Sequence, residues 1–218
     1  MIHRHAENRD GRDFVVGDIH GQYALLQEAL QRVDFETSRD RLFAVGDLID
    51  RGPDSFDCLL LALEPWFYGV RGNHEMLAQA ALESGSASAW VLWLMNGGSW
   101  VRRHEACDVR QRLDAALEQL PYAREVAVAG KRLGIVHAEP PPDWSWIEDG
   151  GEALKEQLVW GRHRIAQQDT TPVEGIDAVV VGHTIVPAPI QLGNVNYIDT
   201  GAFETGRLTL LEARELVT

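Results

Sequence analysis

The sequence predicts an α/β fold in which parallel strands carry polar side chains at their C-terminal ends. Four apolar stretches, at 14–16, 42–45, 134–136 and 178–181, have the composition of buried strands. An Asp or His follows each stretch within two residues. Helical patterns separate the first strands, and open α/β sheets place their sites at the carboxyl ends of strands. We therefore expect these side chains to meet at successive strand ends of one sheet.

The first third of the chain predicts a βαβαβ unit with parallel strands and helices on the sheet faces. Leu25, Leu26, Ala29, Leu30 and Val33 recur at helical spacing after the first strand. Pro53 suits the first turn of a second helix, which Glu64-Pro65 ends. The predicted elements are, in order, a strand at 14–16, a helix at 22–33, a strand at 42–45, a helix from 53 to 63 and a strand at 66–70.

The rest of the chain predicts a helical insert followed by further strands. Ala-rich and Trp-rich sequence from about 76 to 120 indicates helices, interrupted at 96–100. Two strands are expected around a tight turn near Gly130, then loops and a short helix through Leu154 and Leu158. The final strands are expected at 178–181, 195–198 and 207–211. With 218 residues and 45% apolar content, residues 1–218 are expected to form one domain.

Composition disfavours nucleic acid and membranes as partners and indicates a location. The formal charge of -13 disfavours nucleic acid, whose phosphates attract proteins of the opposite charge. Cys58 and Cys107 are the only cysteines and lie in no cluster, so a reducing cytoplasm is expected. The polar first 14 residues lack a signal core, and no apolar run is long enough to cross a bilayer. The sequence leaves the oligomeric state open.

Five short motifs contain side chains suited to metal binding: GDIHG at 17–21, GDLIDRG at 46–52, RGNHE at 71–75, VHAE at 136–139 and GHT at 182–184. Asp18 and His20 alternate by two, so both can face one cation. Asp47 occupies the same place on the next strand, and its two oxygens can bridge ions roughly 3.5 to 4 Å apart. The candidate ligands are Asp18, His20, Asp47, Asn73, His137 and His183. Mixed nitrogen and oxygen ligands suit Mn²⁺, Fe or Zn²⁺ better than Ca²⁺, whose ligands are usually all oxygen.

Such a centre predicts phosphate ester hydrolysis. Two cations lower the pKa of a shared water, and the resulting hydroxide is the expected nucleophile. Arg51 and Arg71 lie beside the motifs, and guanidinium groups match phosphate geometry; a buried ion pair is the alternative role for either. His74, with Asp50 as its partner, is the expected general acid. The alternative is that His74 binds metal in place of Asn73.

These motifs resemble the phosphoprotein phosphatase (PPP) family of metallophosphoesterases, whose pattern is GDxHG, GDxxDRG, GNHE and two later histidines. The resemblance is greatest to the bacterial and bacteriophage-lambda type of serine/threonine protein phosphatase, and it extends from VVGDIHGQY to YIDTGAF. It implies a four-layer calcineurin-like fold with a central β-sandwich flanked by helices, two Mn²⁺-type ions on the same six ligands, and the His74–Asp50 dyad. It also implies Arg51, Arg71 and Arg162 around the phosphate, with Arg164 as the nearest competitor of Arg162.

The resemblance makes a phosphoserine and phosphothreonine phosphatase the leading functional expectation, with phosphotyrosine and phosphohistidine as further substrates of such enzymes. Phosphoproteins or phosphopeptides are then the partners. A symmetrical diadenosine tetraphosphate hydrolase shares the motifs, but those relatives usually have a longer C-terminal region than the tail after Gly206. A catalytically silent phosphoprotein-binding module is the third reading. No ligand or acid position is replaced by Ala or Leu, which argues against it.

Overall fold

Two β-sheets face each other in the computed structural model, which describes residues 1–217. The four-stranded sheet has the order β10 (Leu210–Glu212), β2 (Asp13–Val16), β3 (Arg41–Ala44) and β4 (Phe67–Gly69). The six-stranded sheet has the order β1 (Ile2–His5), β5 (Ala123–Val128), β6 (Lys131–Val136), β7 (Ala178–Val181), β9 (Val195–Tyr197) and β8 (Ile190–Leu192). The candidate ligands therefore come from two sheets, and the expectation of one sheet is wrong.

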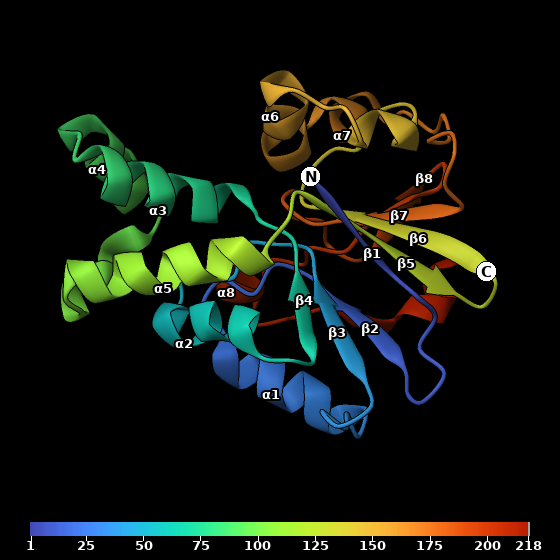
Figure 1. The fold of residues 1–218 in the computed structure, drawn as a ribbon, viewed down its shortest axis with the longest axis horizontal. Coiled ribbons are helices and arrows are strands. Elements are labelled where there is room, and N and C mark those ends of the chain that lie inside the picture. Colours follow the sequence, from blue (N-terminus) through green and yellow to red (C-terminus); the bar gives the residue numbers. More distant parts are fainter. Residues whose placement is uncertain (218) are drawn as a thin grey trace.

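The four-stranded sheet contains the predicted βαβαβ unit. Strands β2, β3 and β4 are parallel and in direct register, with Val15 opposite Phe43 and Phe43 opposite Tyr68. The helices that connect or follow these strands lie together on the outer side of this sheet (Figure 1). They are α1 (Tyr23–Arg32), α2 (Ser55–Leu60) with the 3₁₀ turn η1 (Leu61–Leu63), α3 (Asn73–Ser84), α4 (Ala87–Met95), η2 (Gly98–Arg103) and α5 (Ala106–Gln119). The last four occupy the predicted insert.

Strand side chains alternate between two hydrophobic layers, as the two-residue period of a strand requires. Val15 and Phe43 face the other sheet and pack with Ile135 and Val180. Their neighbours along the strands, including Phe14, point outward and pack under the helices. Both faces of β2 and β3 are therefore covered. This explains why these strands are continuous apolar runs rather than alternating ones.

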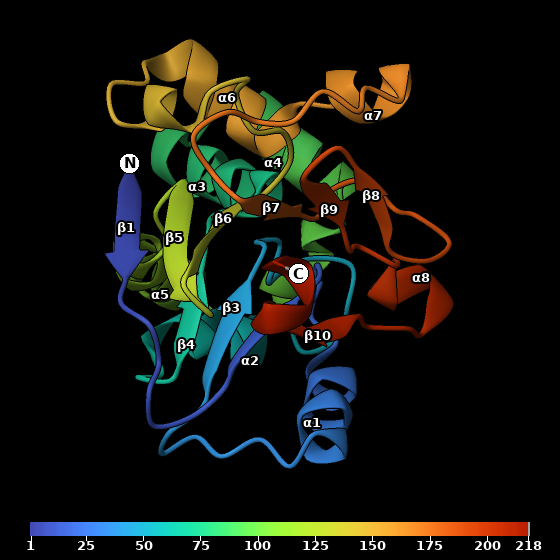
Figure 2. The same ribbon diagram turned by 90° about the vertical axis from the view of Figure 1, so that its right-hand side faces the viewer.

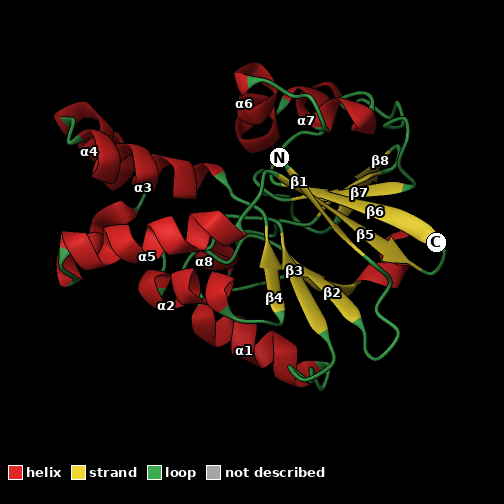
Figure 3. Ribbon diagram, in the orientation of Figure 1, coloured by secondary structure: helices red, strands yellow, loops and turns green. Residues whose placement is uncertain are grey.

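The outer face of the six-stranded sheet is covered by a second, smaller helical layer (Figure 2). It consists of η3 (Trp144–Ile147), α6 (Glu152–Trp160) and α7 (His163–Gln167). Leu158 of α6 and Trp144 pack on Val179 and Val181 of β7. The order helices, sheet, sheet, helices is the four-layer arrangement that the family resemblance implies (Figure 3).

Several short elements were not predicted. Strand β1 is an edge strand whose polar sequence IHRH leaves two residues exposed, so it has no apolar run to detect. Strand β10 begins three residues later than expected. Strand β8, helices α7 and α8 (Ala202–Thr205), and the 3₁₀ turn η4 (Ala213–Val217) were missed because each has at most five residues, too few to show a period. Among residues 1–217, no helix is long and apolar enough to span a bilayer.

Candidate metal centre

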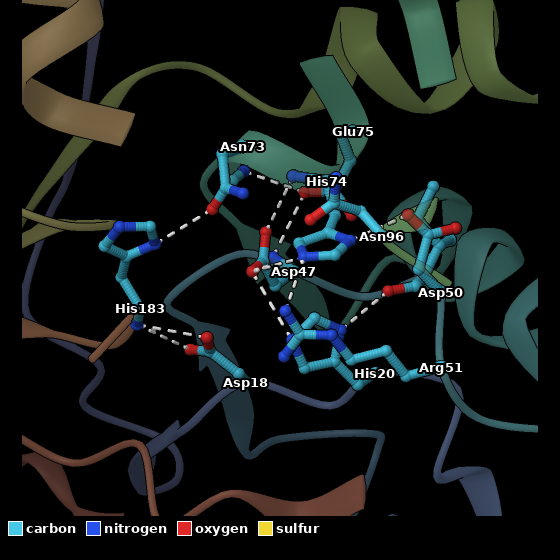
Figure 4. Close-up of polar contacts among 12 residues, drawn as sticks. Asp18, His20, Asp47, Asp50, Arg51, Asn73, His74, Glu75, Asn96 and His183 are labelled. Carbon is cyan, nitrogen blue, oxygen red and sulfur yellow. Dashed lines mark hydrogen bonds and ion pairs between the residues drawn. The ribbon is translucent and has the colours of Figure 1, made fainter. Parts of the chain in front are cut away.

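The loops after β2 and β3 cross at the centre of the site. Both strands end before the motif residues, and the backbone then turns through the left-handed region at His20 (φ 46°) and Asp47 (φ 50°). The amides of Ile19 and His20 both donate to the carbonyl of Asp47, at 3.1 and 2.9 Å. This crossing, rather than strand alternation, brings His20 next to Asp47. Figure 4 shows Asp47 in the middle of the polar side chains.

Asp47 lies between two groups of metal-binding side chains. Its Oδ2 is 3.5 Å from His20 Nε2 and 3.9 Å from His74 Nε2 on one side. The same oxygen is 3.5 Å from His137 Nε2 on the other side. His20, Asp47 and His74 form one buried group, and Asp47, His137 and His183 form the other, each with ligand atoms within 4.8 Å of one another. One carboxylate is therefore placed to serve both groups.

The second group joins the two sheets. Asn73 begins α3 after β4, His137 follows β6 and His183 follows β7. Asn73 Oδ1 is 2.9 Å from both His137 Nε2 and His183 Nδ1, and these two nitrogens are 3.2 Å apart. Asn73 and His183 point toward one another in Figure 4. All three side chains are buried.

The ring nitrogens that carry no proton point toward Asp47, as nitrogens that bind a cation would. His137 Nδ1 is 2.8 Å from the Val45 carbonyl, to which it must donate, so Nε2 of the neutral ring carries a lone pair. That lone pair faces Asn73 Oδ1 and Asp47 Oδ2, which are also acceptors. His20 repeats the pattern, with Nδ1 on the Ile49 carbonyl at 2.8 Å and Nε2 toward Asp47. His183 Nδ1 and the Arg51 guanidinium are the neighbours able to donate to these nitrogens, and a buried set of imidazole, carboxylate and amide groups converging on Asp47 fits divalent metal ions.

Asp18 connects the first sheet to the second. It does not belong to either group of three, but its carboxylate oxygens accept from the backbone amide of His183 at 3.2 and 3.0 Å. Gly182 permits this contact, because a Cβ there would lie 1.9 Å from Asp18 Oδ1. The glycine of the GHT motif is therefore required by the close approach of the carboxylate.

Burial sets the charge states of the centre. It lowers the pKa of His20 to about 3 and, together with the neighbouring His137, that of His183 to about 3, so both rings are neutral at pH 7, the form that can bind a metal. Burial also raises the pKa of Asp18, with Asp199 and Asp47 adding to the effect. For Asp47, burial opposes ionisation, but the surrounding histidines outweigh it and lower its pKa. Asp47 is the most strongly ionised carboxylate of the centre.

His74, a member of the first group, forms a buried pair with Asp50. His74 Nδ1 donates to Asp50 Oδ2 at 2.7 Å. Burial works against a charged ring, but Asp47 and the hydrogen bond with Asp50 raise the pKa of His74 above its usual value. Its backbone amide donates to Asp47 Oδ1 at 3.0 Å. The ring therefore has Nδ1 on Asp50 and Nε2 directed toward Asp47, a position suited to proton donation.

Two tryptophans that sequence reasoning left without a role hold Asp50 in place. The indole nitrogens of Trp93 and Trp100 donate to Asp50 Oδ1 at 3.0 and 2.6 Å. Both residues belong to the WLMNGGSW segment of the helical insert and are buried. The insert therefore supports the carboxylate that orients His74, in addition to forming surface. The repeated tryptophans of that segment were the available signal.

Glu75 is a third residue that was not assigned. It is fully buried and accepts backbone hydrogen bonds from Gly72 at 2.8 Å, Leu48 at 2.8 Å and Asp47 at 3.1 Å. Burial, with the charge of Asp47, raises its pKa to about 7. Glu75 thus fixes the loop that carries Asp47. Its position in GNHE, three residues after the cap residue Gly72, lets its carboxylate accept from the Gly72 amide as the Glu of a capping box does, and this spacing was the signal for it.

Arg51 and Arg162 are the exposed cations at the rim. Two terminal nitrogens of Arg51 lie 3.2 Å from His20 Nε2 and 3.1 Å from His74 Nε2 (Figure 4). Arg162 precedes α7, and its charge adds to the main effect of burial in lowering the pKa of His137. Both residues are exposed, and Arg162 is near enough to His137 and His183 for its charge to add to burial in lowering the pKa of each ring.

Arg71 and Arg164 bond instead to backbone carbonyls. Arg71 donates from Nε to Leu120 and from a terminal nitrogen to Leu117, both at 2.8 Å, at the C-terminal end of α5. Arg164 is buried and donates to the carbonyls of Asp169 and Thr171, at 3.1 and 2.6 Å. Two nitrogens of Arg71 are thus engaged at the end of α5, which favours a structural role for this residue over a phosphate contact, and Arg164 also has a structural environment.

A two-sheet α/β fold whose strand-end loops gather Asp, Asn and His around a shared carboxylate defines a metal-dependent phosphoesterase. Residues 14–187 match the calcineurin-like phosphoesterase family, whose members use a dimetal centre. The chain belongs to this family, and it is therefore a metallophosphoesterase hydrolase.

Two kinds of enzyme are among the known proteins with related sequences. The chain is 39% identical over 213 residues to serine/threonine-protein phosphatase 1 of Salmonella typhimurium, covering 96% of this chain and 95% of that protein. It is 33% identical over 161 residues to a symmetrical bis(5'-nucleosyl)-tetraphosphatase of a Shewanella species, covering 72% of this chain and 53% of that protein. The crystal structure of a candidate diadenosine tetraphosphatase shares the fold, with a TM-score of 0.71, 23% identity, and 97% and 94% coverage.

Proposed function

We propose that this protein is a metal-dependent phosphatase that hydrolyses phosphoserine and phosphothreonine in proteins. Phosphoproteins are proposed as substrates because the sequence matches a serine/threonine-protein phosphatase along nearly the full length of both chains. The tetraphosphatase match includes only about half of that relative. The His74–Asp50 pair supports monoester hydrolysis, because the leaving alkoxide of serine or threonine requires a proton.

In this proposal the chain holds two divalent cations, with Mn²⁺ as the preferred ion and Fe or Zn²⁺ as alternatives. Asp18, His20 and Asp47 hold one ion, and Asp47, Asn73, His137 and His183 hold the other. Bound cations of this kind polarise phosphoryl oxygens and lower the pKa of coordinated water. This assignment accounts for the lone pairs that converge between Asn73 and His137.

The remaining residues act on the phosphate and the leaving group. Arg51 and Arg162 neutralise phosphoryl oxygens that face solvent, as forked guanidinium groups do. His74 donates a proton to the leaving oxygen from Nε2, and Asp50 holds the ring in the orientation that this requires. Trp93 and Trp100 in turn keep Asp50 from rotating.

Competition between substrates tests the proposal. Purified protein with Mn²⁺ is given a phosphoserine peptide, a phosphothreonine peptide and diadenosine tetraphosphate, and kcat/KM is measured for each. The proposal requires preference for the phosphopeptides. Preference for the dinucleotide by orders of magnitude would establish the tetraphosphatase, the second candidate, which the Shewanella relative favours. Binding of phosphopeptide without release of phosphate would identify a non-catalytic binding module.

Two broader proposals accompany this one. We propose that residues 1–218 act as a single catalytic domain, since both hydrophobic layers of the four-stranded sheet and the site itself draw on segments from across the described residues. A reducing cytoplasm is the proposed location, and it is consistent with the two free cysteines, of which Cys58 is buried and Cys107 is exposed.

A further inference from the structure

The ring of Phe203 contacts both Arg51 and His20, and Phe203 is neither a proposed metal ligand nor a proposed phosphate ligand. It belongs to the short helix α8, in the YIDTGAF segment near the end of the chain. The Cζ atom of Arg51 lies 4.4 Å from the centroid of its ring. The same ring meets His20 edge-on, with centroids 5.2 Å apart and an interplanar angle of 81°. Phe203 thus lies between a proposed metal ligand and a proposed phosphate ligand.

The backbone of Arg51 is fixed by a different element. Arg51 has a left-handed conformation (φ 68°), and its amide donates to the Gly97 carbonyl at 3.1 Å. Gly97 itself has φ 103°, and a Cβ there would lie 2.7 Å from Arg51 N. The long side chain of Arg51 remains exposed, and an exposed arginine has many rotamers to lose when it binds a ligand.

We propose that Phe203 is a positioning residue that holds the Arg51 guanidinium ready for the phosphoryl group of the substrate. The inference rests on the proposed function, because it takes Arg51 as a phosphate ligand. A guanidinium over an aromatic face is attracted by the ring quadrupole, and it keeps its N–H groups at the edges free to donate. Gly97 fixes where the side chain of Arg51 starts, and Phe203 fixes where it ends.

Replacement of the ring tests this role. Phe203→Leu keeps an apolar side chain but removes the aromatic face, and Phe203→Tyr keeps the face. With p-nitrophenyl phosphate and Mn²⁺, we expect Phe203→Leu to raise KM about 2- to 5-fold, the size of an exposed cation–π interaction, with a smaller change in kcat. The inhibition constant of inorganic phosphate should rise by the same factor. Phe203→Tyr should restore both values.

A double-mutant cycle shows whether Phe203 acts through Arg51. In an Arg51→Ala background, Phe203→Leu should have no further effect on KM or on phosphate inhibition. An equal effect in both backgrounds would overturn the proposal, as would an unchanged KM in the single variant. Because Phe203 also touches His20, calorimetric titration with Mn²⁺ is run on each variant; weaker Mn²⁺ binding that accounts for the kinetic change would assign Phe203 to the metal site instead.

Phe56 provides a matched control. Its ring packs on His104, with centroids 4.3 Å apart, and lies under the Arg112 guanidinium at 5.4 Å; its centroid is 6.5 Å from that of Trp100, so kcat is followed as a check that the support of Asp50 is intact. Phe56→Leu should leave KM and phosphate inhibition unchanged. If the wild-type protein does not hydrolyse phosphopeptides, only the protein phosphatase proposal is rejected. The mutant cycle can still be measured with p-nitrophenyl phosphate or, without turnover, by calorimetric binding of inorganic phosphate. Equal phosphate affinity of Phe203→Leu and wild type would reject the positioning role of Phe203.

Discussion

The two sides of the metal centre are built in different ways. His20 and Asp47 lie on the loops that follow β2 and β3, and His74 lies in the first turn of α3, which follows the neighbouring strand β4 of the same sheet. His137 and His183, by contrast, follow β6 and β7 of the other sheet. The first side is thus assembled by strand pairing, and the second side forms only when the two sheets pack on each other.

Three contacts link the two sides. Asp47 Oδ2 faces histidines of both. Asn73 and Asp18, from the four-stranded half, reach His183 on the other sheet through its ring and its backbone amide. The proposed metal centre therefore depends on how the two sheets pack. A change that moves one sheet relative to the other separates the proposed ligands although each loop stays intact. We therefore expect different losses of activity and of metal binding from variants at the shared carboxylate Asp47, on one side at His74, and at Gly182, where the two sheets meet (here called the seam).

Asp47→Asn should have the largest effect, since it affects both sides. The amide removes the negative charge that three histidines surround, and it offers one acceptor oxygen where the carboxylate offers two. We expect kcat/KM for a phosphopeptide to fall by at least about 10³-fold. Calorimetry should show that binding of both Mn²⁺ ions is weakened. Loss of only one ion would mean that Asp47 does not bridge.

His74→Asn should remove activity without removing metal. The Nε2 proton donor is lost, so turnover of a phosphoserine peptide should fall by roughly 10²-fold or more, while Mn²⁺ binding stays close to wild type. A substrate with a good leaving group, such as p-nitrophenyl phosphate, should be affected less because its leaving oxygen needs no proton. Equal losses on both substrates, together with weaker Mn²⁺ binding, would make His74 a metal ligand instead.

Gly182→Ala tests the seam between the sheets. A Cβ at this position would lie 1.9 Å from Asp18 Oδ1, so the carboxylate or the loop after β7 must move. Misplacement by about 1 Å can lower a catalysed rate roughly 10²-fold, and we expect a loss of this size in kcat/KM. Gly151→Ala is the control, because nothing lies within 4 Å of an added Cβ there. Similar activity of the two variants would show that the seam tolerates displacement.

The sequence predicted the side chains of the centre better than their supports. Asp18, Asp47 and His183 follow apolar strands directly, so a local pattern indicated them. Glu75 and Phe203 act through distant segments, and their partners are defined only by the tertiary fold. For the same reason, buried runs predicted the inner strands but did not show that β2 and β7 belong to different sheets. Hydrophobic patterning records that a strand is covered on both faces, and it does not record what covers it.

Arg51 and Arg71 give the smallest and most selective test. Arg51→Ala should lower kcat/KM about 10- to 100-fold, the range for a lost charge-assisted hydrogen bond to phosphate, with little change in stability. Arg71 bonds to two carbonyls of α5, so Arg71→Ala should instead lower the free energy of unfolding by about 1 to 2 kcal/mol and change kcat/KM less than about 3-fold. Urea unfolding and phosphopeptide kinetics on both variants measure the contrast. A large kinetic loss in a stable Arg71→Ala protein would return Arg71 to the phosphate site, where its position beside GNHE first placed it.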